Sequence, residues 1–491
     1  MRGHRLRPCR RVPPMPIGKA HFRALADLPW AAKTGPPAPG TTRRNENRKC
    51  EVKTFEAFKA MRSGPVARLV LGSSASRLAT FGFNAAMAVY LLDLTGRATD
   101  LGLALLVGTL PFFALSLVTG VVCDRFNRKN IILVCDALRV LVAVAFLLAA
   151  WLLDTDATVA LVYATVFCFS VCESFVTTSF SSIVPDVIDE EDILDTNNLL
   201  FGIGDAVRMI GPVVGVLLYS TAGFATTAIS TATLFSAAFL FQRGVAYTQS
   251  KASGEGAQGV AAVAREELGM FRKLVTADIR LTSLMANGFT THLFLYPFIT
   301  VGLPYVITQV FRAGSVEFGY LEAVCAAGGI LSLLVVPHTK RLGTSNSLAA
   351  SMAGMIIGAA LFLVLLVGPA VDLMTDQTVA RLGILTLGCF LVFLAFGVYG
   401  TYFVSFMHTN VPSEMLGKGQ SLVMMFNALG RMLGFSLFGL LFDHSLQAAV
   451  IVFVGGMSLK VLVHLPFVKA DRRLRAATAA DAPALEPAAE R

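Results

Sequence analysis

The stretch GVVCDRFNRKN, residues 120–130, joins two long apolar runs through a short charged loop. The run before it ends at Cys123, and the run after it begins at Ile131 and reads IILVCDALRVLVAVAFLLAAWLL. Each run has about 20 residues, the length that an α-helix needs to cross the hydrocarbon core of a bilayer. Loops rich in Lys and Arg stay on the cytoplasmic side. The stretch therefore predicts two membrane-spanning helices joined by a cytoplasmic loop.

The composition of the whole chain is that of a protein with many membrane spans. Of 491 residues, 55% are hydrophobic and only 15% are charged, whereas soluble proteins carry about 25% charged residues. The net charge of +9 does not indicate nucleic-acid binding, because the basic residues lie at the ends of apolar runs. The eight cysteines show no metal-ligand spacing and no secreted-scaffold spacing, so no metal site is expected.

Twelve apolar runs predict an all-α membrane protein. The expected helices are 66–92, 99–123, 131–153, 157–183, 197–219, 222–242, 281–304, 316–338, 346–368, 382–406, 419–442 and 447–468. They form two six-helix bundles, 65–242 and 281–468, joined by a cytoplasmic linker, 243–280, with an amphipathic helix around Phe271. The basic N-terminal extension 1–64 and the tail 469–491 are expected to be disordered. Alternatively, the start codon is misassigned and the native protein begins near Met61.

The basic residues predict the orientation in the membrane. If the N-terminus is inside, the inside segments carry 32 Lys and Arg, and the outside loops carry only Arg97, Arg312 and Arg381. This bias places both termini in the cytoplasm and the chain in the cell membrane as a multi-pass protein.

The two halves resemble each other at corresponding places. Arg208 to Gly211 reads RMIG in the fifth expected helix, and Arg431 to Gly434 reads RMLG in the eleventh. Each stretch follows a Val-Pro turn with a nearby acid. A match between helix five and helix eleven is what two parallel six-helix repeats require.

These residues resemble those of a known family. GVVCDRFNRK is similar to the signature loop between helices 2 and 3 of the major facilitator superfamily, with Asn127 where that family usually has Gly. Gly211-Pro212-x-x-Gly215 resembles its antiporter motif and should let the helix bend and approach a neighbour closely. The stretches REELGMFRKL and VPSEMLGKGQSL look most like the branch of enterobactin exporters and macrolide efflux proteins.

The resemblance implies a conformational latch in the loop. In the family, this loop ties the two halves together on the cytoplasmic face and stabilises the outward-facing state. The latch residues carried over are Gly120, Asp124, Arg125, Arg128 and Lys129. The alternative is a plain topology anchor, which would account for the basic residues but not for Asp124.

Charged side chains near the middle of membrane helices mark candidate functional positions, because each costs at least about 2.5–3.5 kcal/mol to insert. Glu173 has no opposite charge within a turn of its own helix, so its partner would have to be Arg77 or Arg208 from another helix. A carboxylate balanced between a proton and an arginine is what a proton-coupled carrier needs, which makes Glu173 a candidate proton-coupling residue. The alternative is a helix–helix hydrogen bond. Asp136 and Arg139, spaced i,i+3, are interpreted as a self-neutralising pair on a peripheral helix. The proposed proton and substrate cavity comprises Arg77, Glu173, Asp205, Arg208, His292 and Arg431.

The sequence thus favours a monomeric secondary transporter that exports a small organic compound by alternating access. Proton antiport would drive it, with no bound cofactor and no nucleic-acid partner. No GxxxxGK[ST] loop and no nucleophile–base arrangement is present, so an enzyme is not expected. The alternatives are a proton-coupled importer of a small metabolite and a non-transporting sensor or scaffold with the same fold.

Overall fold

The computed structural model describes residues 64–187, 193–247, 278–312, 315–366, 377–411 and 413–480, with four single positions between 265 and 276. The N-terminal extension up to residue 63, the amphipathic helix expected around Phe271 and the last eleven residues lie outside the described residues.

The N-terminal half is built of long helices. They are α3 (Gly64–Thr95), α4 (Ala98–Arg125), α5 (Arg128–Ala149), α6 (Thr155–Val187) and α7 (Ile193–Arg243). Within α7, Gly223 has φ 78° and ψ 177°, a conformation open to glycine at little cost. The chain reverses there, so α7 supplies two spans, as the sequence predicts for 197–219 and 222–242.

The C-terminal half begins with a span of mixed helix type. It runs through α9 (Ile279–Thr290), η1 (Thr291–Leu295), η2 (Phe298–Gly302), α10 (Leu303–Tyr305) and η3 (Val306–Val310). The three η segments are π-helical and lie around Pro297 and Pro304, whose missing N–H groups interrupt the regular hydrogen-bond ladder. The remaining elements are α11 (Ser315–Thr339), η4 (Lys340–Leu342), α12 (Gly343–Leu361), η5 (Phe362–Leu366), α14 (Gln377–Asn410), α15 (Ser413–His444) and α16 (Leu446–Ala480).

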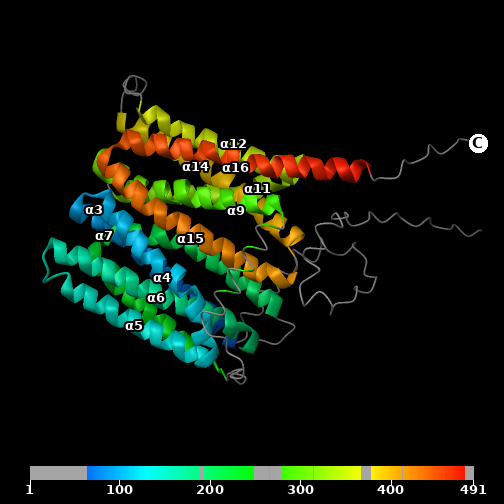
Figure 1. Cartoon of the computed structure of the whole chain (residues 1–491). Coiled ribbons are helices and arrows are strands. Elements are labelled where there is room, and N and C mark those ends of the chain that lie inside the picture. Colours follow the sequence, from blue (N-terminus) through cyan, green and yellow to red (C-terminus); the bar gives the residue numbers. More distant parts are fainter. Residues whose placement is uncertain are drawn as a thin grey trace, which may run out of the picture.

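The prediction of twelve spans is confirmed for the described part of the chain. Ten helical stretches are long and apolar enough to cross a membrane. Two of them, Ile210–Arg243 and Glu317–Leu361, contain chain reversals, at Gly223 and near Gly343. Figure 1 shows the N-terminal half, coloured blue to green, beside the C-terminal half, coloured yellow-green to red.

The last helix is longer than the sequence predicts. We expected it to end at residue 468, but α16 continues to Ala480 and projects beyond the bundle (Figure 1). The prediction of a disordered tail is therefore wrong for residues 469–480. Arg280 of α9 holds the projecting part in place, because its guanidinium lies 3.7 Å from the carboxylate of Asp471. The same guanidinium lies 2.8 Å from the carboxylate of Asp278, just before α9.

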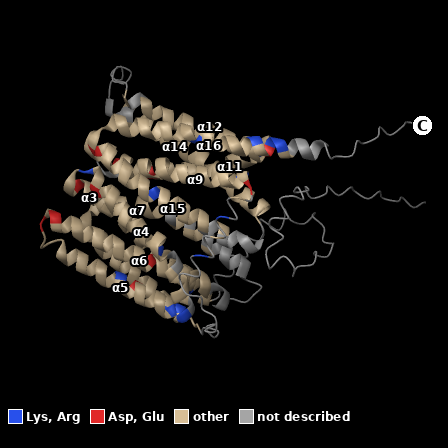
Figure 2. Ribbon diagram, viewed as in Figure 1, with Lys and Arg blue, Asp and Glu red and all other residues tan. Residues whose placement is uncertain are grey.

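The two halves are joined at one end of the bundle, which we call the Gly96 end after the loop between α3 and α4. A single apolar cluster crosses between the halves there and includes Leu92, Leu101 and Val216 from the N-terminal half. The amide of Gln309 also donates to the Leu92 carbonyl at 3.3 Å. Figure 2 shows most of the described charged residues near helix ends and few in the middle of helices.

An aspartate of one half caps a helix of the other at the Gly96 end. The side chain of Arg97, the residue before α4, makes no capping hydrogen bond. The carboxylate of Asp443, near the end of α15, accepts instead from the backbone N–H groups of Ala98 at 2.7 Å and Thr99 at 2.8 Å. A carboxylate suits this place because the first N–H groups of a helix lack partners within it.

Glycines let α4 and α15 approach at this end. A Cβ at Gly102 would collide with the backbone carbonyl of Phe435, and a Cβ at Gly439 would lie 3.1 Å from the Cα of Thr99. The small residues allow nearly direct backbone contact, which is how membrane helices pack most closely.

Candidate functional site

A buried ionic network links three helices of the N-terminal half. Arg139 on α5 lies 2.8 Å from the Glu173 carboxylate on α6 and 3.5 Å from the Asp136 carboxylate on its own helix. Arg139 and Asp136 are fully buried, and Glu173 is 7% exposed. The predicted Asp136–Arg139 pair is present, but it is not isolated, because Glu173 also pairs with Arg139.

Neighbouring polar groups orient this network. The hydroxyl of Ser76 on α3 donates to Asp136 at 3.1 Å and accepts from Arg139 at 2.9 Å. The hydroxyl of Thr177 donates to the second oxygen of Glu173 at 3.0 Å. One atom is left over, since Oδ2 of Asp136 is buried without a hydrogen-bond partner in the described structure. Two carboxylates therefore share one guanidinium, which leaves a net negative charge when both are ionised.

Glu173 is the member of the network that meets a cavity. A small pocket beside it is lined by Ser73, Ser76, Arg77, Glu173, Val176, Thr177 and Phe180. The Arg77 guanidinium packs against Gly204 of α7, where any side chain would collide with it. The structure thus places the predicted residues Arg77 and Glu173 around one pocket. The side chains of Asp205 and Arg208, also on α7, lie outside the described residues.

The motif Gly211-Pro212-x-x-Gly215 packs α7 tightly against α3. A Cβ at Gly215 would collide with the backbone of Gly82, and one at Gly211 would lie 2.9 Å from the Cβ of Phe81. The expected close approach is therefore observed. The helix continues through Pro212.

The basic loop after α4 makes its described contacts within its own half. The Lys129 ammonium donates to the carbonyls of Arg243 at 2.8 Å and Val245 at 2.7 Å, and the Arg128 guanidinium donates to the carbonyl of Ser182 at 3.0 Å. Gly120 lies in α4 and Arg125 is exposed at its end, while the side chain of Asp124 is outside the described residues. The latch role stays a prediction.

The structure explains the departure at Asn127. Asn127 precedes α5, and its side-chain oxygen accepts from the backbone N–H of Asn130 at 3.1 Å. Asn is among the preferred N-cap residues, so it starts the helix in place of the usual glycine.

His292 and Arg431, predicted in the cavity, meet around a tyrosine. The imidazole of His292 stacks on Tyr296 with ring centroids 5.4 Å apart, and the Arg431 guanidinium lies 5.6 Å from the Tyr296 ring centroid. The Nδ1 atom of His292 also contacts the Gly288 carbonyl at 2.9 Å. Both basic side chains therefore contact the same aromatic ring, and the Arg431 contact is a cation–π interaction.

A second buried polar cluster, in the C-terminal half, was missed by sequence analysis. Lys460 on α16 is fully buried and its ammonium donates to the hydroxyl of Thr291. The Lys460 ammonium lies 5.2 Å from the Tyr399 ring centroid, and the amide of Asn287 donates to the Lys460 carbonyl at 3.1 Å. A lysine in the middle of the apolar run 447–468 was a visible signal, by the same rule that selected Glu173.

Comparisons with known proteins agree with this architecture. The sequence model described as Major Facilitator Superfamily matches residues 69–435. Macrolide efflux protein A of Streptococcus pyogenes is 26% identical over 149 residues, which are 30% of this chain and 36% of that protein. The uncharacterized MFS-type transporter YkuC of Bacillus subtilis (strain 168) is 29% identical over 160 residues, 32% of this chain and 36% of that one. The matched stretch thus spans about a third of either relative.

Solved structures with the same fold cover most of the chain. The nucleoside transporter NupG superposes with a TM-score of 0.60 at 14% identity, over 83% of this chain and 99% of that one. A bacterial homologue of the iron transporter ferroportin in its inward-facing state gives a TM-score of 0.61 at 16% identity, over 82% and 98%. Its outward-facing state gives 0.53 at 16% identity, over 83% and 99%.

Proposed function

The chain belongs to the major facilitator superfamily, and from that premise we propose that it exports a small organic compound by alternating access in exchange for protons. The observation that carries this proposal is the buried network of Arg139, Glu173 and Asp136 beside the Arg77 pocket. The partial likeness to a macrolide efflux protein supports the outward direction.

The network has the chemistry of a proton-exchange site. With both carboxylates ionised, one guanidinium faces two negative charges in a medium where an unbalanced charge is costly. One proton taken up by Glu173 would neutralise the cluster and weaken its contact with Arg139. The Arg139 guanidinium would then pair with Asp136 alone. Because Glu173 reaches the pocket, its protonation and the occupancy of the pocket would influence each other.

The positive-inside bias and the closed Gly96 end together support an inward-facing state. Under that orientation, the Gly96 end is extracellular, and the contacts between Asp443 and α4 close it. The loop containing Lys129 would then lie at the cytoplasmic face, with its described contacts inside one half. Substrate would enter from the cytoplasm.

Accumulation measurements test the proposal. Cells lacking their own pumps would be loaded with macrolides, catechol siderophores or cationic dyes, with and without the protein and a protonophore. Lower accumulation that the protonophore reverses is the expected result. Higher accumulation would instead indicate proton-coupled uptake, and no protein-dependent change would favour a non-transporting sensor or scaffold.

The substitution Glu173→Gln tests the proton site directly. It keeps the shape of the side chain but removes the exchangeable charge, so proton-driven efflux should fall to the level of cells without the protein. Counterflow exchange of substrate should persist, because exchange needs no net proton movement. Glu317→Gln is the matched control, because Glu317 is an exposed carboxylate at the start of α11. Unchanged pH dependence in Glu173→Gln would refute the role.

A further inference from the structure

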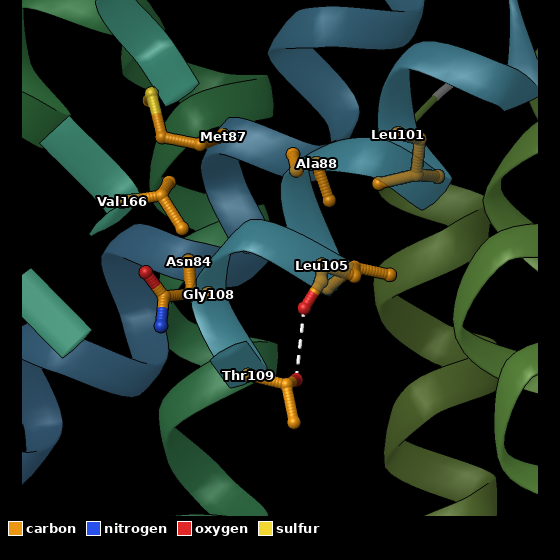
Figure 3. A pocket seen from close by; sticks show the side chains of 9 residues that line it. Asn84, Met87, Ala88, Leu101, Leu105, Gly108, Thr109 and Val166 are labelled. Carbon is orange, nitrogen blue, oxygen red and sulfur yellow. Dashed lines mark hydrogen bonds between the residues drawn. The ribbon is translucent and has the colours of Figure 1, made fainter. Parts of the chain in front are cut away.

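A separate cavity lies between α3, α4 and α6, and the function proposed above does not use it. Its volume is about 110 Å³. Figure 3 shows Asn84, Met87 and Ala88 of α3 on one side, with Leu105 and Thr109 of α4 opposite. It is distinct from the pocket beside Glu173, since the two share no lining residue.

The cavity borders the seam between the two halves. Leu101 and Ala88, which line it, belong to the apolar cluster that joins the halves at the Gly96 end, and Leu105 packs against that cluster. All nine lining residues nevertheless come from the N-terminal half. A molecule bound in this cavity would move with the N-terminal half during a change of state. It would stay next to the surface where the two halves separate.

Two of the nine residues that line the cavity, Asn84 and Thr109, have polar side chains. The hydroxyl of Thr109 is already used, because it donates to the Leu105 carbonyl at 2.8 Å (Figure 3). The Oδ1 atom of Asn84 is buried and has no hydrogen-bond partner among the described residues. An unsatisfied buried polar group costs about 1–3 kcal/mol, so a ligand that forms a hydrogen bond with this amide would recover part of that cost.

Gly108 brings α4 close to α6 at this level. A Cβ at Gly108 would lie 2.9 Å from Val166, which also lines the cavity. The space is therefore shaped by direct helix contact on one side. An apolar protein cavity of about 150 Å³ holds benzene, so a cavity of 110 Å³ with an open side takes one six-membered ring with an edge outside.

We propose that this cavity is a substrate subsite for a hydroxylated ring, with the hydroxyl paired to the amide of Asn84. The inference rests on the proposed transport function, because it assigns part of the transported compound to this place. A hydroxyl both donates and accepts, so it satisfies the amide in either orientation. A charged group is excluded because no charged side chain lines the cavity.

The test is ligand-observed ¹⁹F NMR on the full chain in lipid nanodiscs, with empty nanodiscs to subtract partitioning. The probes are 4-fluorophenol and fluorobenzene, which have the same ring with and without the hydroxyl. Wild-type protein should bind 4-fluorophenol saturably and about tenfold more tightly than fluorobenzene, the upper range for one neutral hydrogen bond. Equal affinities, or no saturable binding, would overturn the proposal and leave a cavity filled by water.

Three variants locate the binding. Asn84→Leu keeps the volume and should weaken 4-fluorophenol about tenfold without affecting fluorobenzene. Ala104→Leu fills the cavity and should abolish saturable binding of both probes. Asn427→Leu is the matched control, since that amide also has a buried unpartnered oxygen but lies on α15, away from the cavity. Unchanged 4-fluorophenol binding in Asn84→Leu would overturn the assignment even if Ala104→Leu failed to fold.

The two proposals fail separately. Binding is measured without a proton gradient, so loss of Asn84-dependent binding with intact protonophore-sensitive efflux would remove the subsite and keep the transport function. Asn84-dependent binding without any efflux would remove the transport function and leave a site that binds a hydroxylated ring but is not a substrate subsite.

Discussion

Removing the carboxylate of Asp443 should shift the protein toward a state that is open at the Gly96 end. The carboxylate accepts two short hydrogen bonds, from the backbone N–H groups of Ala98 at 2.7 Å and Thr99 at 2.8 Å. These bonds cross between the halves, so they exist only while this end is closed. Asp443→Ala removes both, and Asp443→Asn keeps one acceptor oxygen while removing the charge.

The size of the shift follows from capping energetics. Loss of an N-cap side chain costs about 0.5–2 kcal/mol, and loss of a negative charge beside a helix N-terminus costs about 0.3–1 kcal/mol. Water can replace part of this, because the Thr99 contact is exposed. We expect about 1–2 kcal/mol for Asp443→Ala, which changes the ratio of the two states roughly 5- to 30-fold. Asp443→Asn should give about half that free energy.

Double electron–electron resonance between spin labels at positions 152 and 447 would measure the distance distribution that reports this shift. Both positions are exposed near the Gly96 end, one in each half. The population with the longer distance should grow in Asp443→Ala. Asp93→Ala is the matched control, because its carboxylate accepts from the Tyr219 hydroxyl at 2.7 Å at the same end but within one half. Equal distance distributions in the two variants would refute the reasoning.

Three further predictions concern packing, charge and the loop. Gly215→Ala should lower the free energy of unfolding by about 1–3 kcal/mol, because the added Cβ would collide with the backbone of α3. Gly400→Ala is the control and should leave it unchanged, because a Cβ there meets nothing within 4 Å. Arg139→Met should destabilise the protein by about 3–5 kcal/mol, because it leaves two buried carboxylates unpaired. Lys460→Met should be neutral or stabilising, because it replaces a buried charge with an apolar side chain. Thermal unfolding in detergent would compare the stability of the two variants. Asp124→Asn should reduce transport with surface expression unchanged, and normal transport would reduce the loop to a topology signal.

The helices and their order were predictable because each helix corresponds to one continuous apolar run in the sequence. The length of an apolar run sets a span, and the charges at its ends set its limits, so α5 and α6 lie close to the expected 131–153 and 157–183. The end of α16 was not predictable on that basis. Residues 469–480 read KADRRLRAATAA, a charged and Ala-rich stretch, and their helix is continuous with a membrane span. The apolar pattern therefore stops before the helix does.

The partners of the charged residues were the hardest part to predict. Asp136 and Arg139 share a helix, and their spacing alone brings them together. The pairing of Arg139 with Glu173 depends on how α5 and α6 turn toward each other, which no spacing within one helix records. The cap that Asp443 provides to α4 joins residues 345 positions apart. Such contacts become visible only once the helices are packed.

The projecting end of α16 lies outside the bundle and would move together with the C-terminal half. The twelve residues after position 468 extend the helix by about 18 Å at 1.5 Å per residue. The ion pair between Arg280 and Asp471 fixes this extension to the first helix of the same half, so it should turn with that half as a rigid arm. Because the tip lies farthest from any pivot inside the membrane, a small tilt of the bundle becomes a large displacement there. A fluorophore near Arg473 could therefore follow single transport cycles without any label inside the membrane.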